Sequence, residues 1–370
     1  MAIRVRPPRT AFSALGAVSL GFLLCLPGVA FAAPFAYISN RVSDTVSVID
    51  IATNAVVATV NVGDGPEGVA VNASSTRTYV ANGNSNNVSV IDTATNTVVA
   101  TVPVGARPQG VASNPAGTRV YVTNQSGASV SVIDTASNTV TATIPVGSSP
   151  FGVAVNSAGT RIYVGNVGNG TVSVIDAATN AVTATVAVGP GTSGVAVNQA
   201  GTVAYAANES TNTISVINTA TNAVTATVTV GPNPRGVAVN PAGTRVYVAN
   251  LNSNVSVIDT ATNTVVASVV PGTQPTGVAL NAAGTRLYVT NAQSNNVSVA
   301  DTATNTVVAT VAVGTTPATF GLFVGTGGLP PPPPPPPVTQ AAIPTLSEWA
   351  MIALVMLLGF FGIRQMRRSA

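Results

Sequence analysis

A unit of about 42 residues recurs seven times between residues 35 and 325, and this repeat limits the possible folds more than any other feature. All seven tyrosines occupy one position in the unit, where each opens a Tyr-x-x-Asn motif that ends at Asn40, Asn82, Asn124, Asn166, Asn208, Asn250 or Asn291. A V-S-V-I-D-like block follows in every unit, and its last residue is Asp50, Asp92, Asp134, Asp176, Asn218, Asp259 or Asp301. The spacing is regular except for one deletion between Asn250 and Asp259. Consecutive copies of one small unit therefore build most of the chain.

The pattern within one unit predicts four short β-strands. In the second unit these cover residues 68–72, 77–82, 88–92 and 98–104, which are rich in valine and threonine and are separated by polar turns. β-branched residues favour strands, and a period near 42 with several short strands is typical of a propeller blade and not of a helical repeat. The sequence therefore predicts an all-β fold, a seven-bladed β-propeller of four-stranded antiparallel blades.

The residues between the expected strands suit tight turns. In residues 114–118, Pro115 and Gly117 stand where a type I turn needs a fixed φ and then a positive φ. In residues 92–96, the Asp side chain can accept hydrogen bonds from backbone N–H groups and the Asn can adopt the left-handed conformation. These repeated residues could also be metal ligands or catalytic carboxylates, but every unit carries one and Asn218 replaces Asp without breaking the pattern. We interpret them as turn formers.

The first unit lacks its first strand. It starts at the second strand, residues 35–40, and the missing strand is found at the other end of the repeats as residues 319–324. We expect both chain ends to pair in one shared last blade, because closing the ring removes a sheet edge that would otherwise stay unpaired.

Residues 1–32 have the organisation of a secretory signal peptide. An uncharged apolar stretch at residues 11–26 precedes the small-x-small sequence Ala30-Phe31-Ala32. A transmembrane anchor is the alternative, but Pro27 and the small residues favour cleavage. Cys25, the single cysteine, would be removed with this segment, so we expect a mature protein without disulfides. The basic start consists of Arg4, Arg6 and Arg9.

Residues 326–370 divide into a linker and a tail. The linker, residues 326–342, contains eight consecutive prolines at 330–337, which predict a stiff polyproline II spacer. The tail, residues 343–370, predicts a C-terminal transmembrane helix with Trp349 at the headgroup level and a basic cytoplasmic end. Its apolar run, residues 349–363, is short for a permanent span and suits a transient anchor. The residues assigned to the sorting signal are Ile343, Pro344, Thr345, Leu346, Trp349, Arg364, Arg367 and Arg368.

This tail resembles the IPTL-type C-terminal sorting signal of Gram-negative bacteria, which is similar to the PEP-type signals that exosortases recognise. Ala350 stands where that family usually has glycine. The resemblance implies export through the export machinery and a precursor held in the inner membrane by its C-terminal helix. It also implies an exosortase-like enzyme as partner, which processes the tail and transfers the protein to the cell surface.

The Tyr-x-x-Asn and V-S-V-I-D repeats resemble the YVTN-family β-propeller, which is similar to archaeal surface-layer propellers and, more distantly, to seven-bladed lactonases. The resemblance implies the fold and a cell-surface context, and it implies no particular ligand. The expected organisation is a signal peptide in residues 1–32, a propeller in 33–325, a linker in 326–342 and a sorting signal in 343–370.

Charge and composition exclude several classes of function. The chain carries a net charge of +3, but six arginines lie in the two terminal segments, and residues 33–342 hold eight arginines against ten acidic residues. A nucleic-acid-binding protein needs a basic surface, so we expect no nucleic-acid partner. The chain has no His and no Lys, and without Cys25 it also lacks a thiol, so the usual bases and nucleophiles of enzymes are missing.

The leading hypothesis is therefore a surface-displayed binding or structural scaffold without catalysis, cofactor or metal, whose partner is an unidentified protein or polysaccharide. A lactonase-like or other hydrolytic propeller, working with carboxylates, hydroxyls or a metal, is one alternative. A Ca²⁺-stabilised adhesion module is another, because the Asn-rich loops at residues 83–87 and 291–296 offer the oxygen ligands that this cation prefers.

In such a regular repeat, residues that break the consensus without serving the fold are the best binding candidates. They lie just before each first strand, in the connections between blades, which we expect around the mouth of the channel on one face. An exposed Phe151 beside Arg235 and Glu67 is the expected contact set, because aromatics and arginine dominate binding hot spots. Simple drift of solvent-facing loops is the alternative. The full set is Glu67, Arg107, Gln109, Phe151, Ser193, Arg235 and Thr276.

Two further expectations follow. The arginines that open the second strands should lie on the opposite face as solubilising edge charges, and they are Arg77, Arg119, Arg161, Arg245 and Arg286.

Because no side chain of the propeller has an ordinary pKa between about 5 and 8, the temperature midpoint of unfolding should stay nearly constant across that pH range. A strongly perturbed carboxylate would change this and would favour the enzyme alternative.

Overall fold

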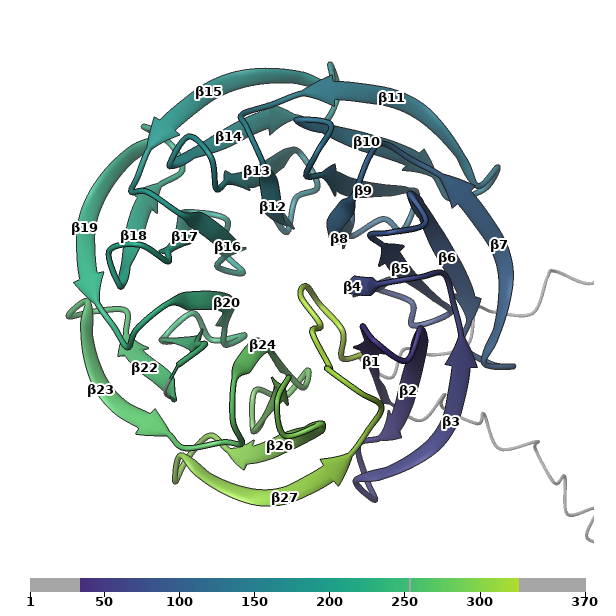
Figure 1. Cartoon of the computed structure of the whole chain (residues 1–370). Helices are drawn as coiled ribbons and strands as arrows, with labels where there is room; N and C mark the ends of the chain where they lie inside the picture. The colour runs from purple at the N-terminus through teal and green to yellow at the C-terminus, as the bar shows by residue number, and fades with distance from the viewer. Residues whose placement is uncertain (1–33, 253, 326–370) are drawn as a thin grey trace, which may run out of the picture. The chain divides into compact units, whose positions relative to one another are not determined.

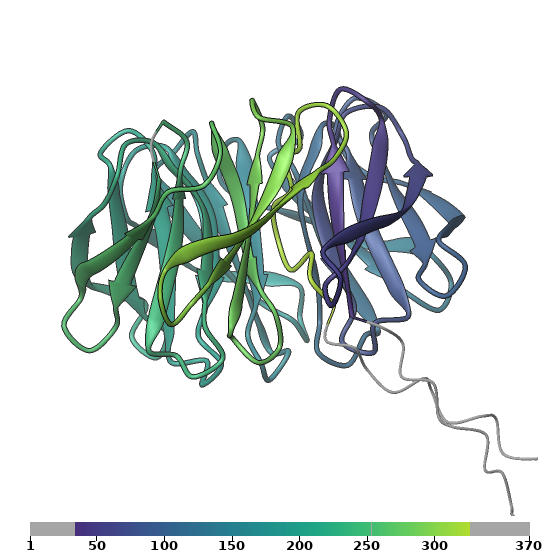
Figure 2. The ribbon, with the colours of Figure 1, turned by 90° about the horizontal axis from the view of Figure 1, so that it is seen from below.

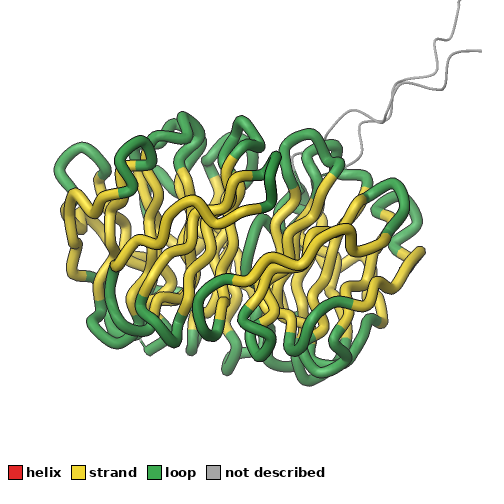
Figure 3. Tube along the Cα trace, turned by 90° about the horizontal axis from the view of Figure 1, so that it is seen from above, coloured by secondary structure: helices red, strands yellow, loops and turns green. Residues whose placement is uncertain are grey.

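The computed structural model describes residues 34–252 and 254–325, which form seven antiparallel β-sheets arranged around a central axis (Figure 1). Six sheets have four strands, and the seventh has three strands plus a segment from the far end of the repeats. The strands run between two faces made of loops, and none of these residues lies in a helix (Figure 3). The predicted seven-bladed β-propeller of four-stranded antiparallel blades is confirmed.

Each four-stranded blade has an innermost strand beside the axis, two middle strands and an outer strand at the rim, and the three-stranded blade has the last three of these (Figure 1). The innermost strands are β4 (Pro66–Val71), β8 (Pro108–Ser113), β12 (Pro150–Val155), β16 (Thr192–Val197), β20 (Pro234–Val239) and β24 (Pro275–Leu280). The second strands are β1 (Phe35–Asn40), β5 (Arg77–Asn82), β9 (Arg119–Asn124), β13 (Arg161–Asn166), β17 (Val203–Asn208), β21 (Arg245–Asn250) and β25 (Arg286–Asn291).

The third strands are β2 (Thr45–Asp50), β6 (Asn87–Asp92), β10 (Ser129–Asp134), β14 (Thr171–Asp176), β18 (Thr213–Asn218), β22 (Val255–Asp259) and β26 (Asn296–Asp301). The outer strands are β3 (Ala55–Asn61), β7 (Thr97–Pro103), β11 (Thr139–Pro145), β15 (Ala181–Ala187), β19 (Ala223–Thr229), β23 (Thr264–Val269) and β27 (Thr306–Ala312). We number the blades 1 to 7 in this order, with β1–β3 in blade 1 and β24–β27 in blade 7.

The strands of the second unit lie where the sequence predicts them, with small shifts. β5 has the expected bounds, whereas β4, β6 and β7 begin one or two residues earlier. β4 begins early because Pro66 already pairs with Asn82 across the sheet.

Three predicted segments lie outside the described residues: the signal peptide (1–32), the linker (326–342) and the tail with its transmembrane helix (343–370). Within the described part of the chain, no helix is long and apolar enough to cross a membrane.

Apolar side chains between neighbouring blades form the core. In one cluster, Tyr79 and Val90 of blade 2 pack against Val111, Val122 and Ile133 of blade 3, and all are buried. The middle strands are buried on both sides, which explains their continuous apolar character. Burial of a valine or isoleucine side chain contributes about 1.5–3 kcal/mol, so the contact between blades, repeated around the ring, is the main source of stability.

The asparagine of each Tyr-x-x-Asn motif locks the two middle strands together. Asn124 is fully buried, and its Nδ2 donates to Ser129 Oγ at 3.1 Å and to Ser131 Oγ at 2.9 Å. The bond to the serine seven residues later has the same length in blade 2, between Asn82 and Ser89. Since a buried amide needs hydrogen-bond partners, the asparagine and the serine of the V-S-V block form one structural pair.

The repeated Asp and Asn residues are turn formers, as predicted. Asp134 Oδ1 accepts hydrogen bonds from the backbone N–H groups two and three residues later, at 3.1 and 2.9 Å. Asn218 accepts the equivalent bonds at 2.9 and 3.1 Å, so it replaces Asp without loss. Asn138 closes the turn with a φ of 52°, a left-handed conformation that asparagine tolerates.

Each outer strand carries a β-bulge. In blade 2, Val90 pairs with Ala100 and Ile91 with Val98, which leaves Val99 unpaired and half exposed. Equivalent register shifts occur in the other blades. Bulges interrupt the row of free backbone groups on an edge strand, so these uncharged outer strands are poor templates for pairing with another chain.

Neighbouring innermost strands approach each other most closely at glycine. A Cβ on Gly194 would lie 1.9 Å from the carbonyl oxygen of Arg235, and one on Gly110 would lie 2.3 Å from that of Phe151. Such distances are far below van der Waals contact, so no other residue fits without moving a strand. Glycine recurs here because the next blade's backbone lies against it.

We expect Gly194→Ala to destabilise the propeller by about 1–3 kcal/mol or more, because overpacking at a rigid contact displaces backbone. Gly83→Ala is the matched control, since its Cβ would meet neighbours at 3.4 Å, an ordinary contact. Chemical denaturation of both variants measures the difference. Equal stability of the two variants would contradict the close approach.

Residues 317–325, here called the closing segment, complete blade 1. Pro317 pairs with Asn40 and Val324 with Ala36, and the Tyr37 N–H donates to the Phe323 carbonyl at 2.9 Å. The predicted closure of one blade by both chain ends is confirmed, and the segment runs beside the axis through the thickness of the ring (Figure 2).

The closing segment is not a regular strand, because it contains two extra residues. Between the equivalent pairings, β24 advances five residues, from Pro275 to Leu280, whereas the closing segment advances seven. The additional length turns toward β4, where the carbonyls of Phe320 and Leu322 accept hydrogen bonds from Val69 and Val71 at 2.8 and 2.9 Å. The segment is therefore bonded to blades 1 and 2 together.

Truncation before Ala318 should open the ring and abolish cooperative unfolding, because blade 1 loses its innermost strand and blade 2 loses two backbone bonds. The control is a chain that ends at Gly328, which keeps the closing segment and lacks only the linker and tail. Thermal unfolding followed by circular dichroism distinguishes them. A chain ending at Pro317 that melts like the control would refute the role of closure.

Candidate functional site

One face of the propeller, here called the mouth face, carries the connections between blades and the loops between second and third strands. These loops hold each other in place: Asn86 Oδ1 accepts a hydrogen bond from the Arg107 N–H at 2.8 Å, and Ser85 Oγ accepts one from the Asp64 N–H at 2.7 Å. The same link joins Asn295 to Thr316 in another part of the ring. The mouth face is thus a rigid set of polar loops.

Six of the seven predicted binding residues occupy equivalent positions, each directly after the first residue of an innermost strand, and Arg107 immediately precedes β8. Two of them serve the fold. Ser193 is buried and donates to the Pro234 carbonyl at 3.2 Å, and the buried Thr276 hydroxyl lies 2.8 Å from that of Thr290. The topology gathers the predicted residues on one face, but it does not leave all of them free.

Phe151 is buried, and the expectation that it is exposed is wrong. Only 4% of its surface is accessible, because Phe320 covers it in an edge-to-face contact with ring centroids 4.9 Å apart. The Arg235 guanidinium lies over both rings, 5.0 Å from the centroid of Phe151 and 5.4 Å from that of Phe320. These three side chains from three different blades form a plug near the axis.

Sequence reasoning missed Phe320. Two signals point to it: Phe320 directly precedes a glycine, as six of the predicted binding residues do, and the segment from Pro317 to Val324 is two residues longer than its counterparts. Neither signal reveals that the ring closes over Phe151.

The remaining charges of the mouth face are mostly paired. Arg235 Nε bonds Glu209 Oε1 at 2.8 Å, and Arg41 Nε lies 3.1 Å from Glu67 Oε1. Burial raises the pKa of the Glu67 carboxyl above its usual value, although nearby guanidinium groups, that of Arg41 first, act in the opposite direction. Glu67 is thus a perturbed carboxylate of the kind that the sequence alone could not identify.

Arg107 differs from the other arginines. It is exposed and has a φ of 53°, and among the arginines that the structure describes it is the one whose guanidinium forms neither an ion pair nor a hydrogen bond. Nearby, the Gln109 side chain is 2% exposed and its Oε1 has no hydrogen-bond partner. The uncommitted polar groups of the predicted set therefore lie around the start of β8.

The arginines of the second strands lie on the opposite face, as predicted, but they are more than solubilising charges. Arg77 and Arg245 form ion pairs of 2.5 Å with the turn aspartates Asp92 and Asp259, and Arg286 pairs with Asp301. Arg119 and Arg161 instead donate to carbonyls of the following blade, those of Ala177 and Thr219, both at 2.6 Å. These arginines therefore stabilise the turns of their own blades or the contact with the following blade.

The Asn-rich loops considered as Ca²⁺ sites use their side-chain oxygens internally. Asn87 Oδ1 and Asn296 Oδ1 accept hydrogen bonds from Asn82 and Asn291 at 2.7 and 2.8 Å. Within residues 34–252 and 254–325, no group of three or more His, Cys, Asp or Glu side chains gathers in a way that could hold a metal ion.

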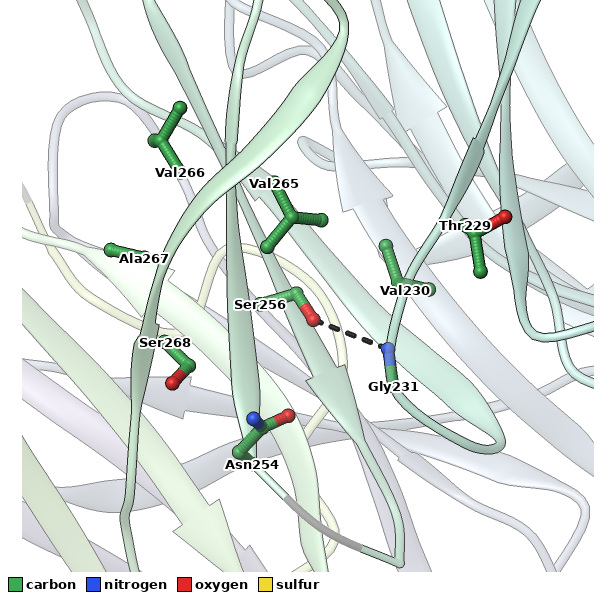
Figure 4. A pocket seen from close by; sticks show the side chains of 9 residues that line it. All are labelled: Thr229, Val230, Gly231, Asn254, Ser256, Val265, Val266, Ala267 and Ser268. Carbon is green, nitrogen blue, oxygen red and sulfur yellow. Dashed lines mark hydrogen bonds between the residues drawn. The ribbon is translucent and has the colours of Figure 1, made fainter.

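A shallow groove of about 440 Å³ interrupts the regular rim between blades 5 and 6 (Figure 4). In other blades a valine after the outer strand donates its N–H to the neighbouring loop, as Val230 does to the Asn212 carbonyl at 2.9 Å. Pro271 occupies this position in blade 6 and has no N–H to donate, and the loop it would meet contains the one-residue deletion. The groove is open and contains no charged side chain.

Comparison with known families agrees with the propeller fold. The model of the YNCE-like beta-propeller matches residues 32–119 and 71–161, and that of the lactonase seven-bladed beta-propeller matches residues 178–267. The IPTL-CTERM motif matches residues 341–368. The chain is a seven-bladed β-propeller with an IPTL-CTERM motif. No curated protein matches this propeller.

Solved structures share the fold of this propeller. One chain of hydrazine synthase from Kuenenia stuttgartiensis is similar with a TM-score of 0.67 and 24% identity, over 72% of this chain and 92% of that one. A functionally unknown protein from Desulfotomaculum acetoxidans DSM 771 has a TM-score of 0.68 and 18% identity, over 79% and 99% of the two chains. At these identities the likeness concerns the fold alone.

The stability of the propeller should decrease as the pH rises through the raised pKa of Glu67. Because folding raises this pKa, the folded state holds the proton more tightly than the unfolded chain, and this stabilisation is complete only below the unfolded pKa. The turn aspartates act in the opposite sense: backbone N–H donors hold the pKa of Asp134 below its usual value, so its contribution is lost as the pH falls.

Thermal unfolding across the acid and neutral range tests both signs. Glu67→Gln should flatten the dependence above the usual carboxyl range, and Asp134→Asn should weaken the loss of stability in acid. A Glu67→Gln variant with the slope of the parent protein would show that another group titrates.

Proposed function

We propose that this chain is an exported, envelope-anchored propeller that acts as a binding or structural scaffold. The match of residues 341–368 to the IPTL-CTERM motif carries this proposal, because such a motif directs a protein to a sorting enzyme. The expected route is a precursor held in the inner membrane of a Gram-negative cell, followed by processing and transfer to the surface. A fold of seven tightly packed blades suits display, since it keeps its loops in fixed positions.

If the tail is a processed signal, the mature surface form should lack Arg364–Arg368. Pro344→Ala and Trp349→Ala should trap the precursor in the inner membrane, because both residues belong to the recognised motif. Ser347→Ala is the control, as position 347 is variable in the motif. Mass spectrometry of the surface form identifies its C-terminal residue. A surface form that still ends at Ala370 would contradict the proposed cleavage.

The mouth face is the proposed binding surface, with Arg107 as its central contact. Equivalent positions in the other connections hold Gly65, Ser149, Gly191, Asn233, Gln274 and Thr316. A long side chain in the left-handed region costs of order 1 kcal/mol or more and persists where it serves another purpose. An exposed guanidinium without an internal partner suits a carboxylate or carbonyl group of a partner molecule.

Arg107→Asn should weaken partner binding by about tenfold or more, the loss expected for one charge-assisted hydrogen bond. It should not lower the melting temperature, because asparagine tolerates a positive φ. Arg119→Gln on the opposite face is the control and should lower stability while leaving affinity unchanged. Titration of the immobilised propeller with the isolated partner measures both variants, and a sensitive Arg119 variant would place binding on the other face.

A lactonase-like hydrolase is the second candidate, supported by the family match at residues 178–267 and by the buried carboxyl of Glu67. A carboxylate with a raised pKa at the mouth of a propeller could act as a general base. Turnover of chromogenic lactones that is lost in Glu67→Gln would establish this activity. Hydrolysis that is unchanged in that variant would exclude Glu67 as the base.

A further inference from the structure

The closing segment has a direction, and that direction decides from which face the chain leaves. Innermost strands start at the mouth face, where Pro66 pairs with Asn82, and end at the opposite face. The closing segment runs the same way, from Pro317 at the mouth to Val324, and the Gly325 N–H donates to the Phe35 carbonyl at 2.9 Å. Residues 34 and 325 therefore lie together on the face opposite the mouth.

The closing segment is also fastened more firmly than a single edge pairing would allow. Its backbone bonds both β1, through Phe323, and β4, through Phe320 and Leu322. Its Phe320 side chain is packed against Phe151 of blade 4 and Arg235 of blade 6. The closing segment is therefore held by contacts with four blades, numbers 1, 2, 4 and 6.

The two faces differ in whether their arginine side chains are bonded within the propeller. All five arginines of the opposite face bond to aspartates or carbonyls of the propeller itself. The mouth face has the exposed Arg107, whose guanidinium forms no bond within the described part of the propeller. The guanidinium that is available to a partner therefore lies on the face away from residue 325.

We propose that the closing segment sets the orientation of the displayed propeller, so that the mouth face points away from the anchoring membrane and is the surface a partner reaches. This inference rests on the proposed anchoring of the tail. The partner it fits lies outside the membrane and offers an acidic or carbonyl group to Arg107. The opposite face, from which the chain leaves, faces the lipid without binding it.

The chain from residue 33 onward, which is the form expected after removal of the signal peptide, offers a direct test because it contains no cysteine. In this chain, Ser126→Cys places a fluorescent donor on the mouth face, and Ser137→Cys places it on the opposite face of the same blade. Both positions are exposed. A six-residue strand spans about 20 Å, so the two donors differ in height enough for energy transfer to headgroup-labelled lipid in phosphatidylcholine–phosphatidylglycerol vesicles to separate them.

We expect both variants to float with the vesicles and the donor at position 137 to lose more fluorescence than that at position 126. Flotation with equal quenching, or with stronger quenching at position 126, overturns the orientation and leaves anchoring intact. Absence of flotation overturns the anchoring, and with it this inference.

Discussion

The rest of the structure depends on the close approach of neighbouring innermost strands at the axis. Backbone carbonyls lie so near to glycines such as Gly194 and Gly110 that a single methyl group would displace a strand. This contact sets how closely the blades converge, and the apolar packing of their middle strands fills the widening space between them. Uncharged hydrogen bonds such as that from Asn124 to Ser131 then fix each sheet. The propeller is held by packing and short polar contacts, in agreement with a sequence that offers no disulfide.

The sequence predicted the architecture because each part of it is local and repeated. Strands, turns and the exchange of Asn218 for Asp follow from patterns within one unit, and the count of seven follows from repetition. Closure by both ends was also predictable, since one strand is missing at the start and present at the end. The irregularity of blade 6 could be anticipated in part, because Pro271 lacks the N–H that the equivalent valines donate and the loop that it would meet is one residue shorter.

The candidate site was less predictable because its contacts join blades that are distant in sequence. Phe151, Arg235 and Phe320 meet only after the ring closes, so the burial of Phe151 has no local signal. The hydrogen bond from Arg119 to the Ala177 carbonyl likewise depends on how one blade packs against the next. What the sequence could provide was the location: residues that depart from the repeat do gather on one face, where Arg107 remains uncommitted.

The closing segment also separates the residues that complete the fold from the residues that direct sorting. In the part of the chain that the structure describes, the backbone bonds that close the ring involve residues up to 325, whereas the sorting motif begins at residue 341. A protease that cut anywhere in the tail would release a ring that is already shut, with no strand withdrawn. Delivery and folding can therefore change independently, and the same tail could serve any domain whose last strand is equally well buried.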